Sequence, residues 1–210
     1  MTSLPRVIPL FPLPDVVLFP RASLPLHIFE PRYRRMVADA LAGDKTIGMV
    51  LLRPGWEADY RGRPPVFGSG CAGRIEECQP LPDGKYNLVL RGLTRFRVVE
   101  EHGGQPYRLA TVEPVPESEG ASSDLDAARR RVLAAIGKAE DGPAVMVLNS
   151  DLPHGAFVDA LSQWLPLGPL ERQSLLDCDS TAARYARLLE VLEFRQVEQT
   201  WGRSRNPVVH

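Results

Sequence analysis

The sequence contains no long uninterrupted apolar segment, although 44% of its 210 residues are hydrophobic. Its 20 prolines break every apolar run. A membrane-spanning helix needs about 20 consecutive apolar residues, and a secretory signal needs a basic start followed by an unbroken apolar stretch. We therefore expect no membrane span, no membrane partner and no export signal.

Cysteine and lysine are also scarce. The chain has three cysteines, an odd number without the spacing of a disulfide framework, and its only lysines are Lys45, Lys85 and Lys138. Few cysteines fit a reducing compartment, so we predict a cytoplasmic protein. The net charge of −1 gives no general attraction to nucleic acids, and no DNA partner is expected.

Motifs of common catalytic sites are missing. The chain has neither a G-x-S-x-G nucleophile elbow nor a G-x-x-x-x-G-K-[ST] phosphate-binding loop. The adjacent pairs Glu76-Glu77 and Glu100-Glu101 would face opposite sides of a strand, so neither pair forms an acid–base dyad. We expect no catalytic residues, no enzymatic activity and no cofactor. A hydrolase or transferase whose pocket the sequence does not reveal is a third alternative to the two functions discussed below.

The histidines do not form a metal-binding pattern. His27, His102, His154 and His210 are scattered, and none stands at a ligand spacing from a cysteine or carboxylate. His27 lies between apolar neighbours in an expected strand, so we predict a hydrogen-bonded core histidine. No metal site is expected.

Residues 68–73, Gly-Ser-Gly-Cys-Ala-Gly, match the G-x-G-x-x-G pattern of dinucleotide-binding loops. That chemistry needs a helix that starts at the glycines, whereas the following segment reaches Pro80 too soon to form one. The glycines instead predict a β-bulge or a barrel corner. Cys71 and Cys78 are seven residues apart, so on a regular strand they face opposite sides and share neither a metal nor a disulfide unless a bulge intervenes.

The first half of the chain predicts short strands around one helix. Pro31 suits the first helical position, apolar residues follow at spacings of three and four, and Gly43 ends the helix. Asp83-Gly84 marks a tight turn, and Gly92-Leu93 separates the next pair of strands. The expected strands are residues 6–10, 16–19, 24–29, 46–52, 66–78, 85–91, 94–101 and 107–114.

Composition changes after Pro114. Residues 1–116 predict a β-rich subdomain, residues 117–123 a polar linker, and residues 124–210 a helical subdomain. Ser123 with Asp126 suggests a cap for a helix over 124–138. One apolar stripe comprises Phe157, Leu161, Trp164 and Leu165, a second comprises Tyr185, Leu188, Leu189 and Leu192, and Pro169 suits the start of the helix between them. The class is therefore α+β.

Several segments together resemble the N-terminal domain of Lon proteases. The proline-punctuated opening, residues 4–20, is followed by the motif of residues 26–36, Leu-His-Ile-Phe-Glu-Pro-Arg-Tyr-Arg-Arg-Met. Cys71 replaces a threonine that is usual in the family, and Arg172 stands where lysine is common. Asp179 and Leu188-Leu189 continue the likeness, as do segments 70–75, 81–84, 89–96 and 165–176.

The resemblance implies a PUA-like β pseudo-barrel followed by a C-terminal α-helical bundle. It also implies that the motif of residues 29–33, Phe-Glu-Pro-Arg-Tyr, is a structural strand-to-helix corner fixed by the proline, with Tyr33 packed inward and Arg32 or Glu30 holding the corner together. In Lon this region recognises substrates and supports assembly, without catalysis. The chain ends at His210 without ATPase or protease modules, so it is similar to stand-alone bacterial Lon-domain proteins and no proteolysis is expected.

The leading hypothesis is a non-catalytic module that binds polypeptide segments or a partner protein. Its candidate contacts are Trp56, Tyr60 and Arg61, in a Gly/Pro-rich loop where large aromatics either pack back onto the fold or meet a partner. The alternative is an RNA-binding protein that uses the PUA-like barrel, with Arg91, Arg95 and Arg97 lining a phosphate-binding face.

Overall fold

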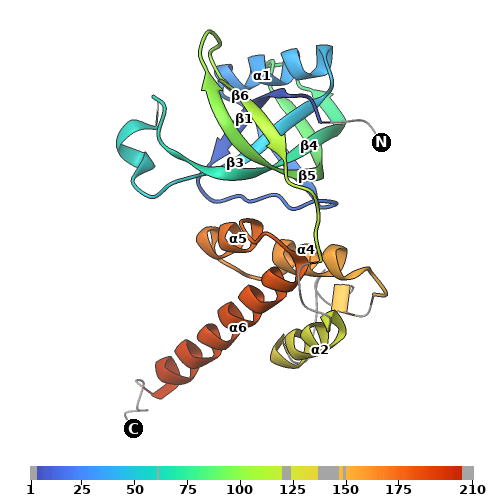
Figure 1. The fold of residues 1–210 in the computed structure, drawn as a ribbon. Coiled ribbons are helices and arrows are strands. Elements are labelled where there is room, and N and C mark those ends of the chain that lie inside the picture. The colour runs from blue at the N-terminus through green and yellow to red at the C-terminus, as the bar shows by residue number, and fades with distance from the viewer. Residues whose placement is uncertain (1–3, 61, 120–123, 137–146, 149, 205–210) are drawn as a thin grey trace. The chain divides into compact units, whose positions relative to one another are not determined.

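The structure is a computed structural model of the chain (Figure 1). It describes residues 4–60, 62–119, 124–136, 147–148 and 150–204, with side chains as far as residue 197. The chain divides into two compact units. The strand-rich unit comprises Met1–Pro116 with Pro166–Leu176, and the helical unit comprises Glu117–Leu165 with Asp177–His210. Each is described separately.

The strand-rich unit contains a mixed six-stranded sheet in the order β2-β5-β4-β3-β1-β6. Strand β5 also pairs with β6, so the pairings β5-β4-β3-β1-β6 return to β5 and form a ring (Figure 1). Among the described strands, β1 and β3 are parallel neighbours and the other pairs are antiparallel. The predicted α+β class is confirmed. The strands are β1 (Val7–Leu13), β2 (Ser23–Ile28), β3 (Thr46–Leu52), β4 (Val66–Pro80), β5 (Tyr86–His102) and β6 (Arg108–Pro114).

The opening of the chain departs from the predicted strands in two places. Strand β1 runs through Pro9 and Pro12 to Leu13, beyond the predicted end at Leu10. Residues 16–19 form no strand, although Val17, Leu18 and Phe19 are buried. The apolar run was therefore a correct signal for burial and a wrong one for a strand, because irregular backbone can also cover a core.

Two apolar layers stabilise this unit. Within the ring of strands, a cluster of buried side chains fills the interior: Ile8, Leu10, Val50, Ala72, Phe96, Ala110 and Val112. Helix α1 (Pro31–Ala42) buries Tyr33, Met36, Val37 and Ala40, and the Tyr33 ring lies 4.5 Å from that of Phe11 in β1. The predicted helix from Pro31 to the Gly43 cap is confirmed.

Strand β5 corrects a second prediction. Gly92-Leu93 does not separate two strands, because β5 continues from Tyr86 to His102. The register moves from Ala72↔Thr94 to Gly73↔Gly92, which leaves Leu93 as an extra, bulged residue. A bulge bends a strand without ending it, and the same two residues therefore mark a bend.

A bulge in β4 also reverses the prediction that Cys71 and Cys78 face opposite sides of the strand. Ile75 pairs with Leu90 and Cys78 pairs with Leu88, so Glu76 is an extra residue in β4. Leu88 and Leu90 share a face of β5, and Cys78 therefore shares a face with Ile75 and Cys71. Neither cysteine forms a disulfide, although they share a face.

Helix α5 (Pro169–Leu176) belongs to the strand-rich unit. The buried Arg95 guanidinium in β5 donates to the Leu176 carbonyl at 3.1 Å, and the Gln173 amide donates to the Ser69 carbonyl in β4 at 3.3 Å. The predicted helical subdomain, residues 124–210, includes this helix, whereas the structure groups it with residues 1–116.

The helical unit contains α2 (Leu125–Ile136), α4 (His154–Trp164) and α6 (Thr181–Ser204). Phe157 and Leu161 of α4 and Tyr185 and Leu188 of α6 are buried as predicted, but Trp164 is 45% exposed and does not belong to the stripe. Residues 120–123 of the predicted linker and the end of the predicted 124–138 helix lie outside the described residues. Within the described ranges, no helix has both the length and the apolar character needed to span a membrane.

The bend in β5 gives a direct test of the fold. A Cβ at Gly92 would lie 2.1 Å from the Phe19 carbonyl oxygen, and two backbone hydrogen bonds of 2.8 Å join Gly92 to Arg21 and Ala22. Backbone cannot rotate away, so Gly92→Ala should lower the free energy of unfolding by about 1–3 kcal/mol. Urea denaturation measures this. Gly103→Ala is the control, because nothing lies within 4 Å of its added Cβ; equal stabilities of the two variants would contradict the bend.

Candidate functional site

The loop that carries Trp56 and Tyr60 is fixed at its end to the start of α1. Trp56 begins the short 3₁₀ helix η1 (Trp56–Asp59), and its ring packs edge-on against that of Tyr60 at 5.4 Å. The Tyr60 hydroxyl donates to Glu30 Oε1 at 2.6 Å. This hydrogen bond raises the pKa of Tyr60 above its ordinary value, so the phenol stays protonated at neutral pH.

Arg32 joins the loop to the corner before α1. Its Nε contacts Glu30 Oε2 at 3.1 Å, and its guanidinium lies 5.2 Å from the centre of the Tyr60 ring. Tyr33 packs inward, and burial raises its pKa to about 12. The corner predicted from the resemblance is present, and Tyr60 is held against it. Arg61, the third candidate contact, lies outside the described residues.

A concave surface with a volume of about 510 Å³ lies on one face of β2, β5 and β4. The strand register places its side chains in two rows, one formed by Pro25, Val89 and Glu77, the other by His27, Asn87 and Gln79. We call these six residues the β2–β5 groove. The first row therefore offers apolar contacts at Pro25 and Val89 and a carboxylate at Glu77, and the second row offers hydrogen-bonding side chains.

The polar row is ordered by a cross-strand contact. The His27 Nδ1 and Asn87 Oδ1 atoms are 2.7 Å apart, and the Phe29 ring stacks on His27 at 6.1 Å while remaining 57% exposed. The prediction of a core histidine is wrong, because His27 is exposed. Its apolar neighbours Leu26 and Ile28 lie on the opposite face of β2. Their hydrophobicity therefore does not indicate whether His27 is buried.

Cys78 also lines the groove, at the position of β4 between Glu77 and Gln79. Burial raises the pKa of the Cys78 thiol. A thiol with a raised pKa carries little thiolate at neutral pH and is a poor nucleophile.

The arginines of β5 do not form the common face that the RNA alternative requires. The bulge at Leu93 places Arg91 on the side opposite Arg95 and Arg97. Arg95 is 3% exposed and donates to the Leu176 carbonyl, whereas Arg91 donates to the Ser23 hydroxyl at 2.9 Å. Arg95 and Arg91 therefore serve packing and strand pairing.

The glycine motif of residues 68–73 lies inside β4, so no helix starts there and the nucleotide-loop geometry is absent at these residues. A Cβ at Gly70 would lie 2.2 Å from the Met49 carbonyl oxygen, so this glycine permits close strand packing. Over the described part of the chain, no group of three or more histidine, cysteine or acidic side chains could hold a metal ion.

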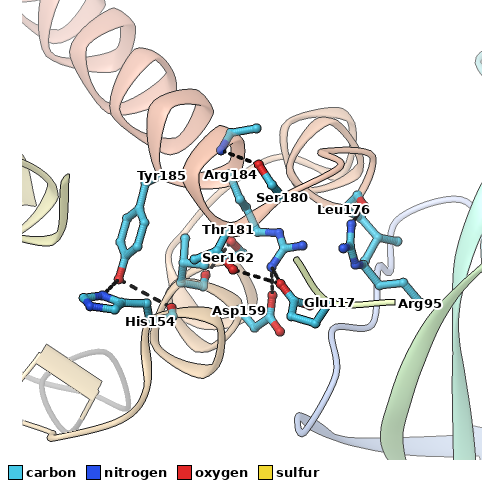
Figure 2. A network of polar contacts seen from close by, with 12 residues as sticks. Arg95, Glu117, His154, Asp159, Ser162, Leu176, Ser180, Thr181, Arg184 and Tyr185 are labelled. Atoms are coloured by element: carbon cyan, nitrogen blue, oxygen red, sulfur yellow. Dashed lines mark hydrogen bonds and ion pairs between the residues drawn. The ribbon is translucent and has the colours of Figure 1, made fainter. Parts of the chain in front are cut away.

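The helical unit contains a separate network of buried charges (Figure 2). Arg184 of α6 is fully buried, and its Nη1 contacts Asp159 of α4 at 2.6 Å and Glu117 at 3.3 Å. The Thr181 hydroxyl also donates to Glu117 at 3.0 Å, and its amide donates to the Ser118 carbonyl. The network joins α4, the start of α6 and the segment after the sheet. We interpret it as structural, because its members hold one another within the unit.

Removing this arginine should destabilise the helical unit. Arg184→Leu removes the ion-pair partner of Asp159, whose carboxylate is buried at 0% exposure, at a cost of about 3–5 kcal/mol. Thermal unfolding followed by circular dichroism measures the loss. Arg187→Leu is the matched control on α6: its exposed pair with Glu190 should contribute no more than about 1 kcal/mol. Similar losses in the two variants would refute the structural role of the network.

Comparisons with known proteins agree on one family. The family model of the ATP-dependent protease La (LON) substrate-binding domain matches residues 7–193. Lon protease 2 of Sorangium cellulosum is 28% identical over 201 residues, which cover 91% of this chain and 25% of that protein. Lon protease 2 of Myxococcus xanthus is 29% identical over 198 residues, with 90% and 24% covered. The chain spans about a quarter of the length of these curated relatives.

Solved structures show the same architecture. A crystal structure of a Lon N-terminal domain protein from Xanthomonas campestris has a TM-score of 0.61 at 27% identity, and the match covers 88% of this chain and 97% of that one. The N-terminal domain of Mycobacterium avium complex Lon protease has a TM-score of 0.68 at 16% identity, with 89% and 98% covered, and shows the fold alone.

Proposed function

Because the chain belongs to the family of ATP-dependent protease La (LON) substrate-binding domains, we propose that it is a non-catalytic module that binds unfolded polypeptide segments in the β2–β5 groove. The observation that carries this proposal is a row with two apolar members, Pro25 and Val89, and the Glu77 carboxylate, which lies beside a row of hydrogen-bonding side chains. An extended peptide presents the same two kinds of group, because its side chains alternate with backbone amides and carbonyls.

The polar row suits a peptide backbone of any sequence. Asn87 and Gln79 carry both a donor and an acceptor on their carboxamides, and the His27 ring adds another polar group. Such groups hydrogen-bond to main-chain amides without selecting a side chain. Pro25, Val89 and the exposed Phe29 ring supply apolar contact area, and the volume of about 510 Å³ lies within the usual range for ligand pockets.

The open edge of β2 offers a poorer site than the groove face. Among the described strands, β2 pairs with β5 alone, so one edge is open, but Pro25 occupies its middle. A proline in an edge strand supplies no N–H and interrupts any ladder that an added strand would form. We therefore place the peptide across the face of the three strands. Trp56, Tyr60 and Arg61 are proposed as a second contact region.

Charge in the groove tests the proposal. Val89→Asp replaces the apolar side chain between Pro25 and Glu77 with a second carboxylate, which an apolar peptide side chain would have to desolvate, so the Kd for an unfolded polypeptide should rise about tenfold. Fluorescence anisotropy with a labelled, reduced and carboxymethylated protein as the unfolded probe measures this. Val89 is half-buried on the open face, so the variant should keep its fold.

Val99→Asp is the matched control. Val99 lies in the same strand, is 55% exposed and is outside the groove. The Val99→Asp variant should bind the unfolded polypeptide with the affinity of the wild type. Wild-type affinity in Val89→Asp, with the melting temperature preserved, would exclude the groove as the binding surface.

A further inference from the structure

A second, smaller cavity lies in the strand-rich unit outside the β2–β5 groove. It encloses about 240 Å³. Three segments meet there: the first turn of α1, the end of the loop before β4, and the hairpin between β5 and β6. The lining residues are Arg32, Tyr33, Gly62, Arg63 and residues 105–108, Gln-Pro-Tyr-Arg.

Two of its three arginines are already neutralised. Arg108 is 6% exposed, pairs with Glu101 at 3.1 Å and donates to the Pro64 carbonyl at 2.6 Å. Arg32 pairs with Glu30. These contacts fix the two guanidinium groups in place. Their charges are balanced by carboxylates, and they leave a rigid, donor-rich wall.

Arg63 provides a guanidinium that forms no ion pair within the described residues, although the Asp59 carboxylate accepts a hydrogen bond from the Arg63 backbone amide at 3.2 Å. The guanidinium donates to the His102 carbonyl at 3.2 Å. A carbonyl is a neutral partner, so the positive charge persists at the rim of the cavity. A cationic, preorganised pocket favours an anion.

Tyr33 adds an uncommitted donor. The residue is 5% exposed, and across the described residues its hydroxyl has no hydrogen-bond partner. Burial raises the pKa of Tyr33 to about 12, so the hydroxyl keeps its proton at neutral pH. The other phenol, Tyr107, already donates to Asp39 at 2.8 Å. Tyr33 lines the cavity, so an anion bound there could accept a hydrogen bond from its hydroxyl.

We propose that this cavity binds a compact oxyanion, a carboxylate or phosphate group, with Arg63 as the charged ligand and Tyr33 and Arg108 as further donors. The size supports a single group over a whole nucleotide or coenzyme, because about 240 Å³ is below the usual range of ligand pockets. The site is independent of the groove, so it can be tested whether or not the groove binds peptides.

Calorimetric titration of the whole chain with two probes tests the site. Inorganic phosphate represents a phosphate group, and acetyl-triglycine with a free C-terminal carboxylate represents a peptide end; the amide of the same tripeptide is its neutral counterpart. Binding of either anion supports the proposal. Phosphate binding alone identifies a phosphate ligand, and binding of the acid without the amide identifies a peptide carboxylate.

Variants then show whether the probe binds in this cavity. Arg63→Gln should raise the Kd of the bound probe about tenfold, and Tyr33→Phe should raise it several-fold. Arg53→Gln is the control, since Arg53 is an exposed arginine of the same loop that contacts the Val66 carbonyl outside the cavity. Absence of heat from both anions at about 10 mM, a concentration at which even millimolar affinity is detected, would overturn the proposal, as would equal losses in Arg63→Gln and Arg53→Gln.

Discussion

The strand-rich unit depends on one constraint: β5 must pair with β2 and β4 along its first part and with β4 and β6 along its second. A straight strand cannot change partners in this way. Bulges at Leu93 and Val99 supply the bends, and Gly92 allows the strand to pass within contact of the Phe19 backbone. The ring of strands and the open β2–β5 groove are therefore two consequences of the same bent strand.

Much of the fold follows from local sequence. Strand β3 was predicted with its observed bounds, because residues 46–52 form a near-continuous apolar run, and all seven positions are buried in the structure. Helix α1 was predicted from Pro31, its apolar spacing and Gly43. The division of β5 into two strands was wrong for a physical reason: a glycine beside a bulky residue is compatible with a turn or a bulge, and only the partner strands decide between them. The α5 contacts with Ser69 and Arg95 are likewise non-local.

The candidate site was less predictable. Trp56 and Tyr60 could be selected from the sequence because large aromatics in a Gly/Pro-rich loop are conspicuous. The groove had no such signal, since its six residues come from three strands and their common face depends on the bulge at Glu76. That bulge also changes the side on which Cys78 lies. Face assignments beyond a bulge require the register, which a sequence alone does not contain.

The central claim is that an unfolded polypeptide lies across the β2–β5 groove. Hydrogen–deuterium exchange, measured by mass spectrometry with and without the same carboxymethylated polypeptide, tests it most directly. Binding in the groove predicts slower exchange in peptides that cover Ser23–Ile28 and Tyr86–Val89, with exchange in α2 unchanged. Slower exchange confined to the helical unit, with β2 and β5 unaffected, would contradict it.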